Sequence, residues 1–299
     1  MHKKTDKTVQ QHAGEENKKP DSRKKKRSKV LYTVCMIVLL CIFVGCGLYL
    51  AFYYWQSKKS EDRVDELKAL IIEDDSDESE PDTGYEGTPT DAKPKIEYVE
   101  IDGVLVQKKF EQLYTENHDF IGWLTIDDMV IDYPVMQSMY DEEFYLHKDF
   151  DKKYSNAGTL FIDTSSDVKA PSDNLIIYGH HMQTGKMFGE LESYAKQSFY
   201  EEHKYISFDT IYGDGTYEVI AAFYTKIYEK EYTGFKYYQF FDAENEEAFD
   251  SFVSNCKNLT GYEIPATAVY GDKLITLSTC AYHTDNGRFV VVAKKIADE

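Results

Sequence analysis

Cys280 is the residue of this chain with the clearest potential for chemistry. It ends a strand-like run that begins at Lys273, and the polar residues after it are typical of a turn. A cysteine at a strand end acts as a nucleophile once a base or a cation favours its thiolate. A buried cysteine that only packs is the alternative. A disulfide between Cys256 and Cys280 also stays open from the sequence.

The candidate base is His180. It follows Gly179 at the end of a second strand-like run, residues 174–180, where a glycine lets the backbone turn and leaves the imidazole beside open space. The adjacent His181 raises two alternatives, a polar loop and a metal site. Neighbouring strand residues point to opposite faces, and the sequence has no HExxH pattern or second ligand cluster. We therefore predict no metal.

Arg288 is the candidate cation. It begins the last strand-like run, residues 288–296, eight positions after Cys280. If the two runs pair as a hairpin, the guanidinium lies beside the thiol at one end of the sheet. There it would favour the thiolate and hold a carbonyl oxygen on which negative charge develops. A surface ion pair with Asp285 or another acid is the alternative.

The elements that must position these side chains are mostly β-strands. An alternating pattern around Asp127 and Asp128 predicts two strands and a tight turn. Further strands are predicted over residues 157–163, 174–180, 205–210, 217–225, 267–270, 273–280 and 288–296. Helices are predicted over residues 104–118, 187–203 and 243–257. Many short strands with few long helices favour a barrel or a sandwich in one mainly-β domain.

Ahead of this domain lies an uncharged segment, residues 30–55. As a helix its 26 residues reach about 39 Å, enough to cross a hydrocarbon core of about 30 Å. A buried core helix and a cleaved signal peptide are the alternatives. Residues 1–29 carry 11 Lys and Arg against 4 Asp and Glu, so the positive-inside rule predicts a cytoplasmic N-terminus. The catalytic part then lies outside the cell.

Charge separates the remaining chain into two parts. Residues 56–95 carry 6 basic against 13 acidic residues and are predicted to be an acidic extracellular linker. Residues 96–299 are predicted to be the catalytic domain. The whole chain of 299 residues has a net charge of −19, which disfavours a nucleic-acid partner because phosphate binding needs a basic face.

Taken together, several motifs resemble the sortase family. They are the membrane segment, NLIIYGHHM around His180, TLSTC ending at Cys280, and Arg288 before VVVA. Residues 120–137, 143–150 and 157–163, with a segment that begins MFGEL, resemble class B sortases. The resemblance covers about residues 98–298. It implies a closed β-barrel of seven or eight strands with peripheral helices and no cofactor.

The resemblance also implies a role for each candidate. Cys280 would be the nucleophile, His180 the acid and base, and Arg288 the partner of the substrate and of the oxyanion. Ser278 and Tyr178 fall at positions that line the site. The implied enzyme is a membrane-anchored transpeptidase of a Gram-positive surface. It cleaves a C-terminal sorting motif of secreted proteins after Thr and passes the thioacyl product to an amine of the lipid-linked cell-wall precursor.

Three other functions stay open as alternatives. A pilus-polymerising sortase would use a pilin lysine as the amine. A papain-like or NlpC-type hydrolase is disfavoured, because its cysteine would begin a helix and precede its histidine. A non-catalytic receptor would bind through the aromatic-rich residues 223–241, which carry nine aromatic side chains. In a class B sortase the same residues would wall the substrate groove, and packing in the core is the plainer explanation.

Overall fold

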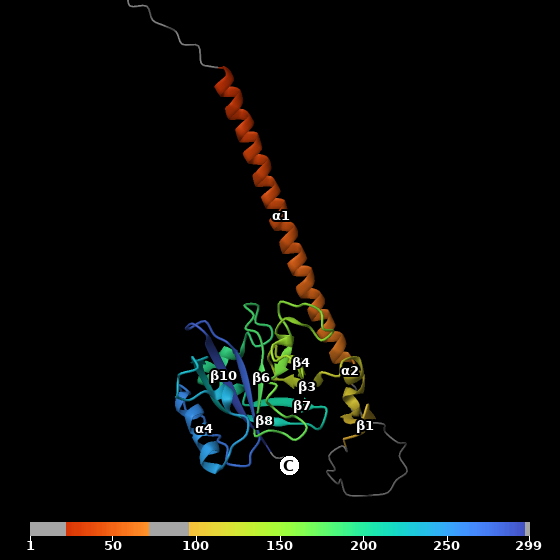
Figure 1. The fold of residues 1–299 in the computed structure, drawn as a ribbon, viewed down its shortest axis with the longest axis vertical. Coiled ribbons are helices and arrows are strands. Elements are labelled where there is room, and N and C mark those ends of the chain that lie inside the picture. Colours follow the sequence, from red (N-terminus) through yellow and green to blue (C-terminus); the bar gives the residue numbers. More distant parts are fainter. Residues whose placement is uncertain (1–21, 72–95, 297–299) are drawn as a thin grey trace, which may run out of the picture. The chain divides into compact units, whose positions relative to one another are not determined.

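The structure is a computed structural model that describes residues 22–71 and 96–296 (Figure 1). It divides into two units, one up to Ser57 and one from Lys58 onward. The long helix α1 (Ser22–Ala69) contributes to both. Among the described residues it is the one helix long and apolar enough to cross a membrane, by length and composition. Residues 1–21 of the predicted tail and residues 72–95 of the predicted linker lie outside the described residues.

The second unit contains a closed barrel of eight strands, as the resemblance implied. The strand order around it is β10-β8-β7-β3-β4-β5-β6-β9. The strands are β3 (Phe120–Thr125), β4 (Asp132–Met136), β5 (Leu160–Ile162), β6 (Asn174–Tyr178), β7 (Tyr205–Thr210), β8 (Thr216–Lys226), β9 (Leu274–Cys280) and β10 (Gly287–Lys295). The pairs β4–β5 and β6–β9 are parallel, and the others are antiparallel.

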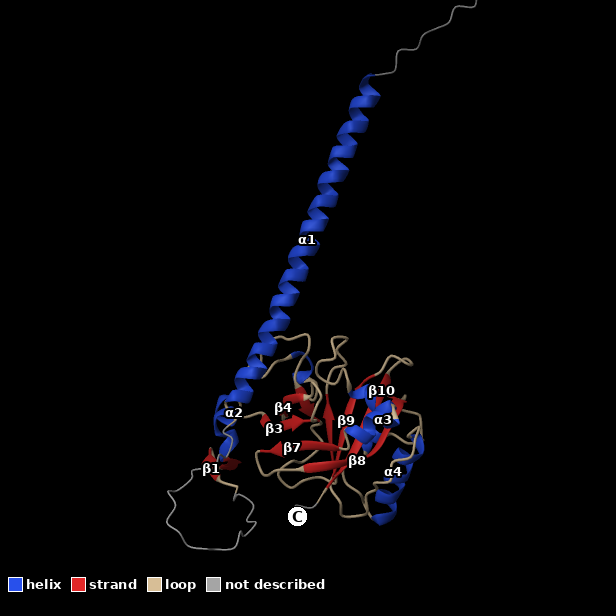
Figure 2. Cartoon of the chain, turned by 180° about the vertical axis from the view of Figure 1, so that it is seen from behind, coloured by secondary structure: helices blue, strands red, loops and turns tan. Residues whose placement is uncertain are grey.

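Alternation along the strands gives the barrel a filled interior and a partly covered outer face. Ile177, Leu277 and Val291 belong to a buried cluster with members from all eight strands, so they face inward. Val290 and Val292 point the other way and pack with the helix α4 (Glu246–Leu259), which lies against the outer side of the barrel (Figure 2). Val290 pairs with Ser278 on β9. Ser278 and the β9 residues two positions before and after it therefore lie on the outer face as well.

The helix predicted over residues 243–257 is confirmed as α4, with its start moved to Glu246. Asn245 sets this start, because its side chain accepts a hydrogen bond from the Ala248 amide at 2.9 Å. The helix predicted over residues 187–203 is wrong as a single helix. It is a 3-10 turn η3 (Leu191–Ala195) and a short helix α3 (Gln197–Glu202), separated by Lys196 in an extended conformation.

The prediction of a helix over residues 104–118 is correct only in its second half. Residues 104–107 form β2 (Val104–Gln107), which pairs with β1 (Tyr98–Ile101) as an antiparallel hairpin. A 3-10 turn η1 (Lys108–Phe110) and the helix α2 (Glu111–Glu116) follow. Of the apolar side chains at helical spacing, Phe110, Leu113 and Tyr114 are buried in one cluster, while Leu105 on β2 is 60% exposed.

The strand predicted over residues 267–270 is wrong. Val269 is 63% exposed, and its amide donates to the Asp272 carboxylate at 2.9 Å in a turn. The barrel explains the difference, because β9 already has β6 on one side and β10 on the other. A closed barrel leaves no free edge to which another strand of this segment could add.

Candidate active site

The hairpin of β9 and β10 brings Cys280 and Arg288 together. Arg288 is the direct cross-strand partner of Cys280, and the ladder continues with Val290 opposite Ser278. The turn between the strands is closed by the Ala281 amide, which donates to the Gly287 carbonyl at 3.0 Å. Directly opposed residues of an antiparallel pair project to the same face. Both side chains are half-buried and lie on the outer face of the barrel, so the predicted hairpin is confirmed.

The end of β6 lies on the other side of β9. Tyr178 is the parallel neighbour of Ser278, and the Gly179 amide donates to the Ser278 carbonyl at 3.2 Å. The Thr279 hydroxyl donates to the Gly179 carbonyl at 2.8 Å. His180 and Cys280 each follow this neighbouring pair by two residues. They therefore leave the sheet at the same end, with Cys280 between the end of β6 and β10.

The His180 ring is fixed by the 3-10 turn η2 (Phe144–His147). Its Nε2 lies 2.8 Å from the Leu146 carbonyl, and the His147 ring stacks on it at 5.4 Å between centroids. A carbonyl only accepts hydrogen bonds, so Nε2 carries a proton and Nδ1 remains for proton exchange. Burial lowers the pKa of His180 and the charge of His147 adds to this, while the Leu146 bond opposes it.

Two glycines permit this close packing around His180. A Cβ at Gly158, which has a φ of +60°, would lie 2.4 Å from the Leu146 carbonyl oxygen. A Cβ at Gly179 would lie 2.5 Å from a methyl carbon of Leu160 and 2.6 Å from the Phe188 ring. The glycine before His180 is therefore required by the approach of two apolar side chains. The sequence offered only the turn as its explanation.

Ser278 and Tyr178 share the outer face with Cys280. Ser278 is 1% exposed, and its hydroxyl lies 2.7 Å from the Tyr237 hydroxyl. The Tyr178 hydroxyl donates to the Asp163 carboxylate at 3.1 Å, and burial raises its pKa. Both residues thus lie close to the candidate nucleophile along β9 and β6, and their role in lining the site stays a prediction. Ser278 is bonded to a side chain that the sequence reasoning did not single out.

Tyr237 is that missed residue, and it lies on the 3-10 turn η4 (Tyr237–Gln239). Burial raises its pKa to about 12, while the hydrogen bond with Ser278 and the charge of Arg288 oppose the rise. The hydroxyl is therefore within electrostatic reach of the candidate cation. The signal in the sequence was the aromatic run of residues 223–241, of which Tyr237 and Phe223 are buried against α4.

The other thiol of the second unit, Cys256, packs in the core. Cys256 is fully buried on α4, and burial raises the pKa of its thiol. Both Cys256 and Cys280 are free cysteines, so the disulfide that the sequence left open is not formed. Within residues 22–71 and 96–296, no three His, Cys, Asp or Glu side chains converge as a metal site would need. The absence of a metal and a cofactor stays a prediction.

The fold and this arrangement define a class of enzyme, the cysteine transpeptidases built on a closed eight-stranded barrel. A sortase domain model matches residues 124–296, and the chain belongs to the sortase family. Sortase B of Staphylococcus aureus is 35% identical over 193 residues, which are 64% of this chain and 76% of that protein. Sortase B of Listeria monocytogenes is 28% identical over 262 residues, 87% of this chain and 94% of that protein.

Solved structures agree with this assignment. The Staphylococcus aureus sortase B–substrate complex is 35% identical, with a TM-score of 0.59 over 65% of this chain and 87% of that chain. Sortase B of Bacillus anthracis in complex with AAEK1 is 26% identical, with a TM-score of 0.63 over 82% of this chain and 100% of that chain. The chain is therefore a class B sortase, and the enzyme type is a cysteine transpeptidase.

Proposed function

We propose that this sortase is anchored in the cell membrane and joins secreted proteins to the cell wall. In this proposal Cys280 is the nucleophile, His180 the acid and base, and Arg288 the oxyanion partner. The observation that carries the proposal is the strand register, which sets Arg288 directly opposite Cys280 and ends β6 beside it. The solved complex of Staphylococcus aureus sortase B with a substrate supports a sorting-motif peptide as the ligand.

The first half of the reaction breaks a peptide bond. The Cys280 thiolate attacks the carbonyl carbon of the Thr in the sorting motif, and the carbonyl oxygen becomes an oxyanion. The Arg288 guanidinium stabilises that negative charge as it develops. His180 as imidazolium gives a proton to the leaving nitrogen, the C–N bond breaks, and a thioester with Cys280 remains. Because Nε2 is bonded to the Leu146 carbonyl, Nδ1 is the atom that delivers this proton.

The second half reverses these roles. A primary amine attacks the thioester carbon while Nδ1 of His180 takes its proton. The Cys280 thiolate leaves, and a new amide joins the molecule that carries the amine to the secreted protein. No oxidant, metal or nucleotide takes part in this balance. We expect the amine of the lipid-linked wall precursor as the acceptor, as in the wall-anchoring function that the class B motifs imply.

Anchoring supports this choice of partners. The exposed apolar residues of α1 from Val30 to Trp55 suit a lipid surrounding, and Lys and Arg precede them in the sequence. The basic residues favour a cytoplasmic N-terminus. In that orientation the barrel lies outside the cell, where substrate and wall precursor are both tethered to the same surface. Confinement to one surface raises the effective concentration of enzyme and substrates without a new contact.

The test uses the full chain in nanodiscs with fluorogenic peptides that carry NPQTN-, LPXTG- or SPXTG-like motifs. Each peptide is offered oligoglycine, a diaminopimelate-type amine or a lysine side-chain amine, and the products are read by mass spectrometry. We expect cleavage after Thr, an amine adduct, and a thioester on Cys280, all lost in Cys280→Ala. Preference for the lysine amine would favour pilus assembly. Cleavage retained in Cys280→Ala would exclude the mechanism.

A further inference from the structure

His180 is held between two chain segments that come from different parts of the barrel. One contains η2, whose Leu146 carbonyl binds the imidazole and whose His147 ring stacks on it. The other is the segment directly after His180. There the Phe188 amide donates to the His180 carbonyl at 3.0 Å, and His181 forms an isolated β-bridge with Met187. The position of the ring thus depends on how both segments are held.

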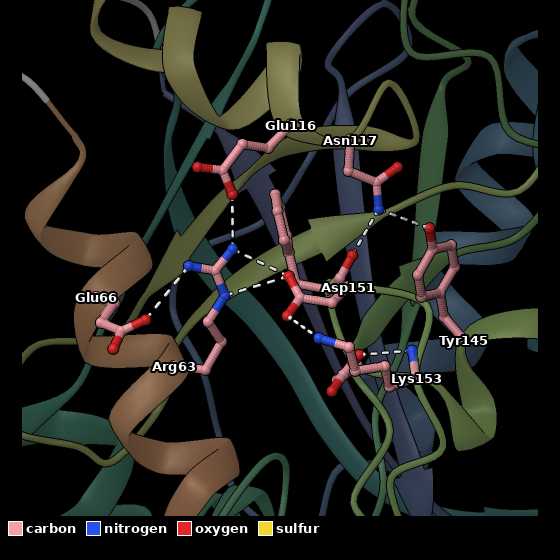
Figure 3. Close-up of polar contacts among 9 residues, drawn as sticks. Arg63, Glu66, Glu116, Asn117, Tyr145, Asp151 and Lys153 are labelled. Carbon is pink, nitrogen blue, oxygen red and sulfur yellow. Dashed lines mark hydrogen bonds and ion pairs between the residues drawn. The ribbon is translucent and has the colours of Figure 1, made fainter.

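The first segment is tied to the last turns of α1 by Arg63 (Figure 3). The Arg63 guanidinium donates to the Asp151 carboxylate at 2.9 and 3.2 Å and to the Glu116 carboxylate at 2.6 Å. It also lies over the Phe150 ring, 5.8 Å from its centroid. Asp151 lies four residues after His147, in a turn over residues 149–153. The Asp149 amide closes this turn by donating to the Lys153 carbonyl at 2.9 Å.

Charge makes Arg63 the central group of this contact. Burial alone would raise the pKa of Asp151, and the bonds from Lys153 and Arg63 bring it below its usual value. The Arg63 side chain is 25% exposed, so its ion pairs are partly shielded from water. Without this cation the carboxylates of Glu116 and Asp151 would face each other with less compensation, and the turn would lose its bond to the helix.

The second segment is tied to the same helix two residues earlier. Glu61 forms an ion pair with Lys186, which directly precedes Met187. Met187 borders a small cavity of about 20 Å³ together with Ser60 and Val64 of the helix. Val64 also packs against the buried cluster that contains Met187, so the helix and the segment are in contact here. Both supports of His180 therefore contact residues 60–64 of one helix.

We propose that residues 58–69 of α1 are a positioning element for His180. Arg63 holds the turn at residues 149–153, directly after η2 with its Leu146 carbonyl and His147 ring, and Glu61 holds the segment that begins at His181. Neither side chain touches the reacting atoms, so both are positioning residues. The inference rests on the proposed role of His180 as acid and base. It gives the end of the membrane-proximal helix a direct part in the geometry of the reaction.

The test compares Arg63→Met with Lys109→Met in the full chain in nanodiscs. Lys109 is a matched control, because its side chain is 24% exposed and it pairs with two carboxylates, Asp209 and Asp214, both at 2.7 Å. Its partners Asp209 and Asp214 lie outside both segments around His180. We expect kcat to fall about 10- to 100-fold in Arg63→Met, with KM nearly unchanged, and to stay near the parent value in Lys109→Met.

A readout that needs no turnover separates this proposal from the proposed function. Histidine labelled with ¹³C at Cε1 is titrated by NMR in the full chain, with His180 assigned through His180→Gln. His147 is the titratable group that stacks on the ring, so it is followed in the same spectra. We expect the His180 pKa to rise towards its ordinary value in Arg63→Met and Glu61→Gln, since the ring becomes more hydrated.

Two outcomes would overturn the positioning role. The first is an unchanged His180 titration in Arg63→Met. The second is an equal loss of kcat in Arg63→Met and Lys109→Met when both are assayed well below their unfolding temperatures. Where the parent chain shows no turnover, the titration alone decides. A shifted His180 in an inactive parent would refute the proposed function and leave the positioning contact established.

Discussion

The two sides of Cys280 are built in different ways. On one side Arg288 is placed by a hairpin whose turn spans residues 281–287, so the contact needs only local pairing. On the other side His180 is bound by Leu146, which lies 34 positions away in the sequence. A guanidinium 88 positions from Asp151 holds the next turn. The positions of the proposed nucleophile and its cation thus follow from strand register, and the position of the proposed base follows from tertiary packing.

This difference predicts how each side tolerates change. The hairpin side has many equivalent ladder hydrogen bonds, and the loss of one side chain leaves its register intact. The histidine side depends on a few contacts between distant segments, and each contact fixes the ring itself. Substitutions around His180 should therefore lower kcat even where they change the free energy of unfolding only slightly.

The largest effect is expected on the hairpin side, where a side chain can lose its chemical group while the strand pairing keeps its place. Cys280→Ala should abolish thioester formation, and Arg288→Lys should lower kcat about 10²- to 10³-fold, because a point charge replaces the planar guanidinium. Both side chains are half-buried at the strand ends, so the free energy of unfolding should change by less than about 1 kcal/mol. Turnover and urea unfolding measure the two quantities. A large loss of stability would show that the hairpin is not independent.

On the histidine side, His180→Gln should lower kcat by about 10²- to 10⁴-fold, the usual contribution of a general acid and base. His181→Gln is the matched control, since His181 is adjacent in sequence and lies 5.3 Å from the Tyr282 ring instead of bonding Leu146. It should retain most of the activity. Equal losses in the two variants would assign the proton transfer to His181.

A backbone change sharpens the contrast without touching the ring. Gly158→Ala should cost at least about 1 kcal/mol, because φ is +60° and its Cβ would lie 2.4 Å from the Leu146 oxygen. The displaced carbonyl should also lower kcat in the fraction that stays folded. Gly213→Ala is the control, since the nearest atom to its Cβ, the Tyr98 hydroxyl, is 3.9 Å away. Unchanged kcat in Gly158→Ala would mean that the Leu146 bond does not position His180.

The Tyr237–Ser278 contact tests the hairpin side for hidden tertiary support. A double-mutant cycle with Tyr237→Phe and Ser278→Ala should give a coupling energy of about 1 kcal/mol for the 2.7 Å hydrogen bond. Urea unfolding supplies the four free energies. Because the loss of this bond should leave the Cys280–Arg288 register unchanged, kcat should fall by less than about tenfold in Tyr237→Phe. A larger fall would show that the hairpin side also relies on distant packing.

The smallest effect concerns pH. The lowered pKa of His180 means that the unfolded chain binds a proton more readily than the folded chain. Its stabilising contribution is complete above the ordinary pKa of 6.5 and is lost as the pH falls towards the folded value. The difference in unfolding free energy between the parent and His180→Gln should therefore shrink below about pH 6.5. A difference that grows on acidification would contradict a His180 pKa that is lowered in the folded chain.

Much of the fold followed from local patterns. The runs that became β6, β9 and β10 were recognised from alternation and apolar content, and α4 was recognised from its periodicity. The errors came where tertiary context decided. Residues 267–270 have strand composition but no free edge, and Lys196 divides a helical pattern into two short elements. Composition cannot report whether a pairing partner is already taken.

The site divides in the same way. Cys280, His180, Arg288, Ser278 and Tyr178 were chosen from motif and strand-end positions, and the structure gathers them around the ends of β6, β9 and β10. Tyr237 was not chosen, although it lies in a recognised aromatic run, because no local signal tells which aromatic ring meets a serine 41 positions away.

The sequence by itself determined the family, most of the strand runs and the candidate residues for the chemistry, because these follow from side-chain type and short-range spacing. Only the tertiary structure decided which ring nitrogen of His180 bonds Leu146 and that Arg63 bonds Asp151 in the turn after η2. Those facts depend on contacts between segments separated by up to 88 positions. Such contacts form only when a closed barrel fixes its loops in space, and no local pattern encodes them.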